Sequence, residues 1–133
     1  MLLPTISFMG NCDEAISFYK GAIGAEVKEI AYFRDAPSDS GMDETLPPNF
    51  VMHSEIIVFG TVLCMTDGGH TPITGDYFGL SALLDSAEEV TSVFNKLADG
   101  GQVVEALSSQ FWSSLCGTVT DRFGISWHIC MNS

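Results

Sequence analysis

The side chains of this chain that could do chemistry include His53, Glu55 and His128. His53 and Glu55 stand two positions apart in the stretch FVMHSEIIVF, and His128 stands in VTDRFGISWHI near the end of the chain. Residues two positions apart on a strand share a face, so His53 and Glu55 would project together. An imidazole beside a carboxylate can act as a general acid or base, or hold a metal with further donors. These three residues are the candidate catalytic residues.

His128 lies in a run that alternates like a half-buried strand. It shares the alternation of Ser126 and Cys130, while Trp127 and Ile129 would face the other side. Two interpretations stay open for the imidazole. It forms a hydrogen bond to a neighbouring side chain or water inside the fold, or it handles protons or a ligand.

His53 and Glu55 carry a similar pair of interpretations. They could line a cavity together with His128, where the three would act as an acid–base group or as an unconventional set of metal ligands. Alternatively, they could face solvent on an edge strand. His70 lies in the segment GGHTPITGD, whose composition is typical of a loop. We expect His70 only to form a hydrogen bond within that loop.

The four cysteines are Cys12, Cys64, Cys116 and Cys130, and no two of them form a C-x-x-C motif. The N-terminal stretch MLLPTISFMG does not show the pattern of a secretory signal. We therefore expect reduced thiols in a cytoplasmic protein, most of them structural and buried. Cys12 is the exception, because a thiol near a helix N-terminus can have a lowered pKa.

Composition narrows the classes of partner. The 133 residues are 46% hydrophobic, which is enough for one domain with a proper core. Five Lys and Arg stand against 17 Asp and Glu, a formal net charge of −12. Such a chain has no basic surface for phosphates, so we expect no nucleic acid partner. No apolar run approaches the roughly 18 residues of a membrane span, so we expect no membrane partner.

Hydrophobic periodicity predicts the same order of elements twice. Each half reads strand, helix, strand, strand, strand, with Asn11 and Ser86 as helix caps and a long loop over 34–49. The expected strands are 4–9, 25–33, 50–59, 61–68, 77–84, 102–110, 115–121 and 125–131. The first expected helix begins after Asn11 and ends at Gly24, and the second spans 86–101.

This repeat predicts an α+β fold of two βαβββ modules that form cupped mixed sheets. The modules cover about 1–70 and 71–133 within a single domain, 1–133, because each sheet needs cover for its apolar face. The segments GNCDEAISFYKGAIGAEV and VTDRFGISWHI resemble the vicinal-oxygen-chelate superfamily, which includes glyoxalases, bleomycin-resistance proteins and extradiol dioxygenases. FMGNCDEAISFYKGAIG with DRFGISW is most similar to its PhnB-like branch, often labelled demethylubiquinone methyltransferase-like.

Catalytic members of that superfamily hold a divalent metal at the first and last strands of each module. The matching neighbourhoods offer one plausible ligand, His128, at the last strand. A metal centre needs three or four convergent donors, so we expect no metal and no cofactor. The resemblance places the other metal-ligand positions at three further strands. They are Pro4, Thr5 and Ile6 at the start of the first module, Cys64 or Met65 at its last strand, and Tyr77, Phe78 and Gly79 at the start of the second module.

Aromatic side chains are the better functional hint, because apolar cavities bind flat ligands. Trp112 follows a loop-like Ser-Ser pair, and the resemblance implies that this loop arches over a cavity or meets a partner subunit. We expect Trp112 to be exposed, with a lid or interface role. The candidate ligand-binding residues are Phe8, His53, Glu55, Phe78, Trp112 and His128.

Two functions therefore remain open. The first is a metal-independent protein that binds a small molecule, one that is cationic and planar in keeping with the acidic chain, and that forms a homodimer as the resemblance implies. The alternative is a metal-dependent or acid–base enzyme, of lyase or dioxygenase type, for a small oxygenated substrate. The methyltransferase label is not supported, because the chain has no glycine-rich nucleotide-binding turn.

Overall fold

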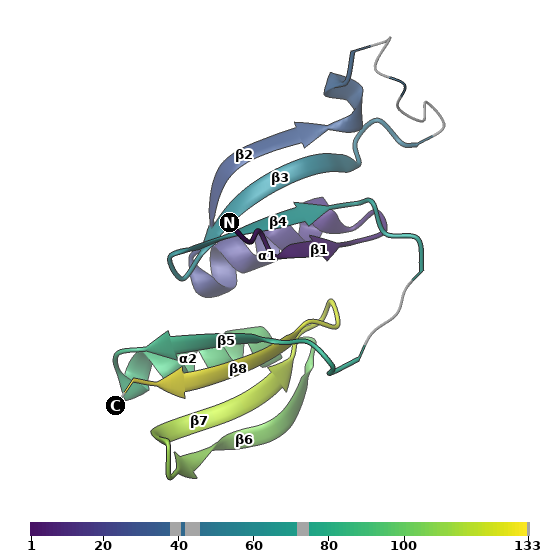
Figure 1. The fold of residues 1–133 in the computed structure, drawn as a ribbon. Coiled ribbons are helices and arrows are strands. Elements are labelled where there is room, and N and C mark those ends of the chain that lie inside the picture. Colours follow the sequence, from purple (N-terminus) through teal and green to yellow (C-terminus); the bar gives the residue numbers. More distant parts are fainter. Residues whose placement is uncertain (38–40, 42–45, 72–74, 133) are drawn as a thin grey trace. The chain divides into compact units, whose positions relative to one another are not determined.

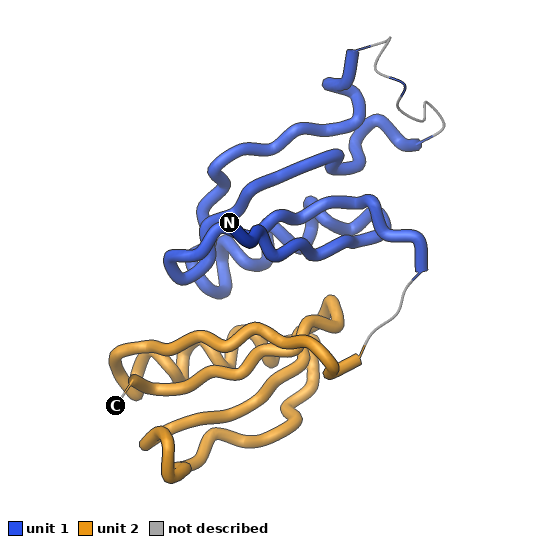
Figure 2. Tube along the Cα trace, viewed as in Figure 1, with its two compact units in different colours: residues 1–72 blue, residues 73–133 orange. Residues whose placement is uncertain are grey.

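The structure of the chain is a computed structural model that describes residues 1–37, 41, 46–71 and 75–132. Parts of the predicted loop at 34–49 and of the GGHTPITGD segment lie outside the described residues. The chain forms two compact units, residues 1–72 and 73–133 (Figure 2). Among the described residues, no helix combines the length and the apolar character needed to cross a membrane.

Unit 1 contains a four-stranded mixed sheet in the order β1-β4-β3-β2 (Figure 1). β1 pairs with β4 in parallel, and the other neighbours are antiparallel. A short 3-10 helix, η1 (Phe33–Asp35), follows the second strand. The elements are β1 (Thr5–Ser7), α1 (Cys12–Ile23), β2 (Glu26–Tyr32), β3 (Val51–Val58) and β4 (Thr61–Thr66).

Unit 2 repeats this arrangement with the strand order β5-β8-β7-β6. β5 pairs with β8 in parallel, and β7 pairs antiparallel with both β6 and β8. The predicted α+β fold of two βαβββ modules with mixed sheets is thereby confirmed. The elements are β5 (Leu80–Leu84), α2 (Ala87–Ala98), β6 (Gln102–Gln110), β7 (Ser113–Thr120) and β8 (Ser126–Met131).

Several predicted boundaries were wrong by two or three residues. The strands expected up to 9 and 68 end at Ser7 and Thr66, the helix expected up to 101 ends at Ala98, and two strands start at other residues than expected. The strand expected from residue 77 begins at Leu80, because Tyr77 and Phe78 are exposed and precede the ladder. The strand expected from residue 115 begins at Ser113, which pairs with Gln110 across the turn. Aromatic residues favour strands in general, but pairing partners decide where a ladder starts.

In each unit the helix covers one face of the sheet. In unit 2, α2 contributes the buried side chains of Val90, Phe94 and Leu97, and it packs on β7 and β8. A Cβ at Gly117 of β7 would lie 2.8 Å from the Phe94 ring, so the close approach of α2 requires glycine there. In unit 1, α1 packs on β3 in the same way.

The two helices begin differently. Ser86 caps α2 as predicted, with its hydroxyl accepting a hydrogen bond from the Glu89 N–H at 3.1 Å. Asn11 occupies the N-cap position of α1 as predicted, but its side chain makes no capping hydrogen bond. A carboxylate from a distant part of the chain, Asp67, takes that role.

Asp67 lies just after β4 and is buried. Its Oδ1 accepts hydrogen bonds from the N–H groups of Gly10, at 2.7 Å, and Cys12, at 3.0 Å. Its Oδ2 accepts from the Val51 N–H at 2.8 Å. The carboxylate therefore joins the corner before α1 to the first residue of β3, and it places an anion at the helix N-terminus where the dipole favours one.

Asp121 has a related role after β7 in unit 2. Its Oδ1 accepts from the N–H groups of Phe123 and Ile125, and its Oδ2 accepts from the Trp127 indole N–H at 2.9 Å. Trp127 is buried on the helix-covered face of the sheet. Asp121 thus fixes the DRFG turn and satisfies the indole N–H in the core.

Replacing Asp67 by Ala should lower the free energy of unfolding by about 2–4 kcal/mol, because three backbone N–H groups lose a charged acceptor. Asp67→Asn should cost less, since one acceptor oxygen remains. Urea denaturation followed by circular dichroism measures both. Asp76→Asn, which removes an exposed charge, is the control. An unchanged midpoint for Asp67→Ala would show that the carboxylate does not hold the corner.

Candidate functional site

The face of the unit 1 sheet opposite α1 carries an imidazole between two carboxylates. Along β3, Ser54, Ile56 and Val58 are buried, whereas His53 and Glu55 alternate with them toward the other face. Glu29 of β2 is directly opposite Glu55 in the ladder. The structure therefore confirms that His53 and Glu55 share a face, although β3 is an inner strand of its sheet and not an edge.

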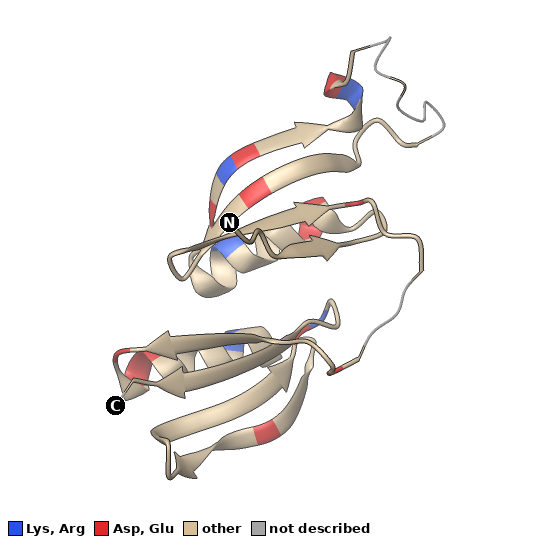
Figure 3. Cartoon of the chain, viewed as in Figure 1, with Lys and Arg blue, Asp and Glu red and all other residues tan. Residues whose placement is uncertain are grey.

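Distances join these three side chains into one cluster. His53 Nε2 lies 3.3 Å from Glu29 Oε1 and 3.6 Å from Glu55 Oε2. Lys28 Nζ lies 3.8 Å from Glu55 Oε1. The His53 side chain is 45% exposed, so a ligand can reach the ring from solvent. Figure 3 shows acidic positions on both β2 and β3, with a basic position beside them on β2.

The pKa of Glu55 is lowered from its ordinary value. The first cause is a side-chain hydrogen bond with Glu29. Loss of solvation is the second and raises the pKa, and Lys28 and His53 then lower it further. The Glu55 carboxylate therefore stays ionised to a lower pH than an ordinary glutamate.

The other ring nitrogen of His53 faces a thiol. Cys64 Sγ of β4 lies 3.6 Å from His53 Nδ1, and Cys64 is directly opposite Glu55 in the ladder. Cys64 is a free, buried cysteine. The imidazole is therefore held between a sulfur on one side and carboxylates on the other, which fixes the direction of Nε2.

Unit 2 has a second histidine with a sulfur neighbour, on the face of its sheet opposite α2. Trp127 and Ile129 are buried toward α2, and His128 lies between them on the other side as the alternation predicted. His128 Nδ1 lies 2.8 Å from Thr118 Oγ1, and Nε2 lies 3.1 Å from Cys116 Sγ. The interpretation in which His128 forms hydrogen bonds to neighbouring side chains is confirmed.

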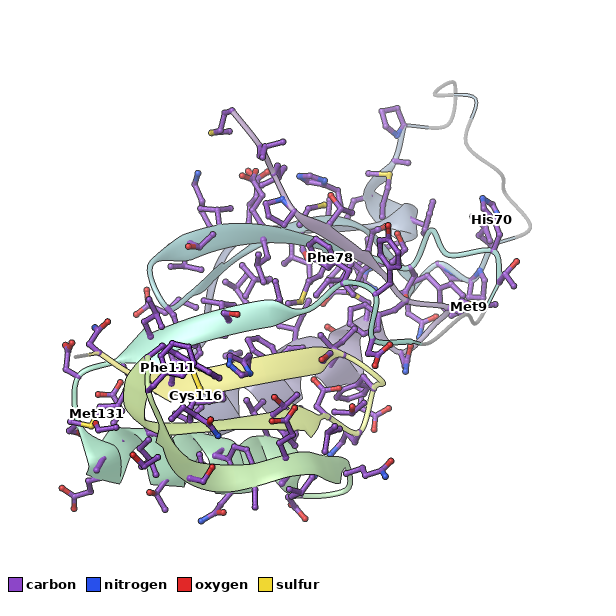
Figure 4. The ribbon with its side chains drawn as sticks, turned by 60° about the horizontal axis from the view of Figure 1, so that its bottom comes forward. Met9, His70, Phe78, Phe111, Cys116 and Met131 are labelled. Atoms are coloured by element: carbon purple, nitrogen blue, oxygen red, sulfur yellow. A yellow bond between two sulfur atoms is a disulfide. The ribbon has the colours of Figure 1, made fainter. Side chains whose placement is uncertain are left out.

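The prediction of four reduced thiols was wrong for two of them. Cys116 and Cys130 form a disulfide (Figure 4). Cys12 and Cys64 are free and buried. The two bonded residues are directly opposite each other on β7 and β8. Fourteen positions separate them in sequence, and only the pairing of the strands brings them together.

The expected lowering of the pKa of Cys12 was also wrong. Cys12 is the first residue of α1, but burial raises the pKa of its thiol well above the ordinary value, and the carboxylates of Asp67 and Asp13 raise it further. The helix dipole at this position is already met by Asp67. Cys12 is a structural thiol and not a reactive one.

The remaining predicted site residues lie apart from these clusters. Phe8 is buried in unit 1, and Phe78 is 71% exposed near the start of β5. Trp112 is 50% exposed, as predicted, and its ring meets that of Phe111 edge to face in the turn between β6 and β7. Their roles in ligand binding stay predictions. His70 is exposed, on the segment after β4 (Figure 4).

Sequence reasoning missed several members of both clusters. Glu29 was not singled out, although it alternates correctly within the predicted strand 25–33. The sequence did not predict that His128 contacts Cys116, Thr118 and Cys130, although Cys130 lies two positions after His128 and therefore on the same face of the strand. The missing information was the register of neighbouring strands, which places Glu29 opposite Glu55 and Thr118 opposite His128.

The divalent metal that the fold family implies does not fit the matching positions. The Thr5 hydroxyl donates a hydrogen bond to the Leu3 carbonyl, and Tyr77 is fully exposed. His128 is the one matching ligand, and its two nitrogens face Thr118 and Cys116 of its own unit. A set with a single donor of this kind does not meet the coordination that such metals require.

The βαβββ repeat, with its parallel outer pair in each sheet, defines the chain as a protein of the vicinal-oxygen-chelate fold. The family model described as 3-demethylubiquinone-9 3-methyltransferase matches residues 1–130. The chain belongs to this family, which is the PhnB-like branch of the superfamily.

Relatives agree with this assignment. Protein YjdN of Escherichia coli (strain K12) is 32% identical over 139 residues, which cover 96% of this chain and 92% of YjdN. Protein PA1353 of Pseudomonas aeruginosa has a TM-score of 0.85 at 29% identity, covering 99% and 97% of the two chains. A FosX variant of Listeria monocytogenes, solved with Mn(II) and 1S,2S-dihydroxypropylphosphonic acid, has a TM-score of 0.69 at 12% identity, covering 100% and 92%.

Thiol counting tests the pairing of the cysteines. Without reductant, the native protein should show no reactive thiol toward Ellman's reagent, because Cys12 and Cys64 are buried and the other two are bonded. Denaturant should expose two thiols, and denaturant after reduction should expose all four. Four thiols in denaturant without reduction would contradict the disulfide.

Carbon NMR of the side-chain carboxyls tests the cause of the lowered pKa of Glu55. Glu29→Ala should raise the pKa of Glu55 toward its ordinary value, because it removes the first cause of the lowering. Lys28→Met should raise it as well. Glu26→Ala, on the same strand, is the control and should leave it nearly unchanged. Because the folded pKa is lowered, the stabilising contribution of Glu55 is present above its unfolded pKa and is lost as the pH falls through the folded pKa. A Glu55 pKa unmoved by Glu29→Ala would contradict the assignment.

Proposed function

We propose that this protein binds a small organic cation, without a metal ion, on the helix-free face of the unit 1 sheet. The observation that carries the proposal is the cluster of Glu29, His53 and Glu55, in which an accessible imidazole lies between two carboxylates. Glu55 is only 20% exposed at its side chain, so its charge is screened less than that of a fully solvated carboxylate.

Charge supports a cationic ligand. The chain has a formal net charge of −12, which favours approach of cations at low ionic strength. Lys28 is the internal cation of the cluster, and it contacts Glu55 at 3.8 Å with a largely exposed side chain. A cationic ligand would displace this lysine and take over its contact with Glu55, while the imidazole offers a flat surface for a planar ligand.

Methyl transfer is not part of this proposal. The corner between β1 and α1 is the place where a phosphate-bearing cofactor would meet a helix N-terminus. Here the N–H groups of Gly10 and Cys12 already donate to the Asp67 carboxylate. This supports a binding function in which the corner is structural.

A homodimer in the cytoplasm belongs to the same proposal. Each sheet ends in edge strands whose outer sides have no partner strand within the described part of their unit, and such edges are commonly covered by another chain. The exposed pair Phe111 and Trp112 offers an apolar contact for a second copy. In a reducing compartment the Cys116–Cys130 disulfide would be opened to two thiols, beside the two free cysteines.

A second candidate is an acid–base enzyme acting on a small oxygenated substrate. The observation that favours it is the contact of His53 Nε2 with Glu29 and Glu55, since a carboxylate that orients an imidazole is a common arrangement for proton transfer. In that case His53 would exchange a proton with the substrate. Loss of turnover in His53→Gln with retained ligand binding would separate this candidate from a binding protein.

Titration with benzamidinium, a small planar cation, tests the proposed binding. Chemical-shift changes should centre on Glu29, His53 and Glu55, and Glu55→Gln should weaken binding by about 2–5-fold, the size expected for one partly exposed charge pair. Lys28→Met should strengthen binding because it removes the competing cation. Glu26→Gln and the uncharged ligand benzamide are the controls. Equal binding of benzamide and benzamidinium would contradict a cation site.

A further inference from the structure

Four side chains of unit 2 form a compact block on the helix-free face of the sheet. Cys116 and Thr118 are two positions apart on β7, and His128 and Cys130 are two positions apart on β8. The ladder places Cys116 opposite Cys130 and Thr118 opposite His128. Strand alternation and register together therefore direct two sulfurs, one imidazole and one hydroxyl into the same small volume.

The donor atoms of this block converge. The ligand atoms of Cys116, His128 and Cys130 all lie within 4.8 Å of one another, and both cysteines are buried while His128 is half-buried. The Thr118 hydroxyl contacts His128 Nδ1 at 2.8 Å. When Nδ1 donates that hydrogen bond, Nε2 keeps its lone pair, and Nε2 is the nitrogen 3.1 Å from Cys116 Sγ.

We propose that the dithiol form of unit 2 binds one thiophilic divalent cation, such as Zn²⁺, through Cys116, His128 and Cys130. Two thiolates and one imidazole are a ligand set that Zn²⁺ prefers, and a set of three leaves the fourth tetrahedral position for a water or a ligand. The charges of two thiolates cancel that of the cation, so the half-buried site carries no net charge.

The backbone suits a bound cation as well as a disulfide. The Cα atoms of Cys116 and Cys130 are 4.2 Å apart, since the residues face each other on neighbouring strands. Around tetrahedral zinc, two thiolates at about 2.3 Å from the metal lie about 3.8 Å from each other. Facing side chains on a ladder can reach that separation by rotating about χ1, without a change in register.

The two forms are connected by a balanced exchange. A small dithiol attacks the Cys116–Cys130 disulfide, passes through a mixed disulfide, and leaves as its own cyclic disulfide. The protein gains two electrons and two protons and carries two thiols. Binding of Zn²⁺ then releases those two protons as the sulfurs become thiolate ligands. The disulfide form has no thiolate to offer, so the redox state decides whether the site exists.

This site goes beyond the proposed function and does not depend on it. It lies in unit 2, while the proposed cation cluster lies in unit 1 and consists of Glu29, His53 and Glu55. Of the three proposed zinc ligands, only His128 stands at a position where the fold family holds its metal. Cys116 and Cys130 do not. Carboxylates and an exposed imidazole suit harder cations, whereas the sulfur-rich set suits zinc.

Metal titration of one protein in two redox states is the direct test. The protein is reduced with dithiothreitol, desalted without oxygen, and titrated with Zn²⁺ against a chromogenic chelator, beside the untreated disulfide form. The dithiol form should bind one equivalent, and the disulfide form should bind about 100-fold more weakly or not at all. Co²⁺ in place of Zn²⁺ should give thiolate-to-cobalt charge-transfer absorption in the dithiol form alone.

Variants assign the ligands. Cys116→Ser, Cys130→Ser and His128→Ala should each remove the tight site, and Thr118→Val should weaken it about 10–100-fold through the orientation of the imidazole. Cys64→Ser and His53→Ala are the matched controls in unit 1 and should leave it intact. If a unit 2 variant fails to fold, the comparison of the two redox states of the unaltered chain still decides.

Three results would overturn the proposal. The first is a dithiol form that binds zinc no more tightly than the disulfide form. The second is tight binding that survives replacement of either Cys116 or Cys130. The third is binding that is lost in His53→Ala, which would assign the metal to unit 1. Benzamidinium binding is measured separately on the disulfide form, so failure of the proposed function and failure of the zinc site are distinguishable.

Discussion

A single helix on one face of each four-stranded sheet is the constraint on which the rest of the structure depends. Because side chains alternate along a strand, covering one face favours at every second residue a side chain that is apolar or, like Ser54, has a hydrogen-bond partner, and frees the others for chemistry. In β3 the covered set includes Ser54, Ile56 and Val58, and the free set includes His53 and Glu55. In β8 the same rule buries Trp127 and leaves His128 on the opposite side.

The two units use this rule to build related but different surroundings for a histidine. In each unit an imidazole nitrogen lies near a cysteine sulfur on the neighbouring strand, Cys64 in unit 1 and Cys116 in unit 2. The other nitrogen meets carboxylates in unit 1 and a threonine hydroxyl in unit 2. One surface is therefore anionic and accessible, and the other is rich in sulfur and half-buried.

Buried carboxylates hold the corners that position these sheets. Asp67 and Asp121 each accept three hydrogen bonds, and each follows directly after a strand. Among the described residues, no buried side-chain nitrogen or oxygen lacks a hydrogen-bond partner. The cost of burying two carboxylates is offset because backbone and indole N–H groups surround them. Asp67 and Asp121 belong to neither histidine cluster, so we assign both carboxylates a structural role.

The sequence by itself determined the order of the elements, the α+β class and the face on which His53, Glu55 and His128 lie, because periodicity is a local property of the chain. The Ser86 cap is local too, and it was predicted correctly. Only the tertiary structure decided that Asp67 supplies the side-chain acceptor that Asn11 does not provide at the start of α1, that Glu29 meets Glu55, and that Cys116 meets Cys130. These contacts depend on strand register and on chain segments far apart in sequence, and a one-residue shift in register would separate each facing pair.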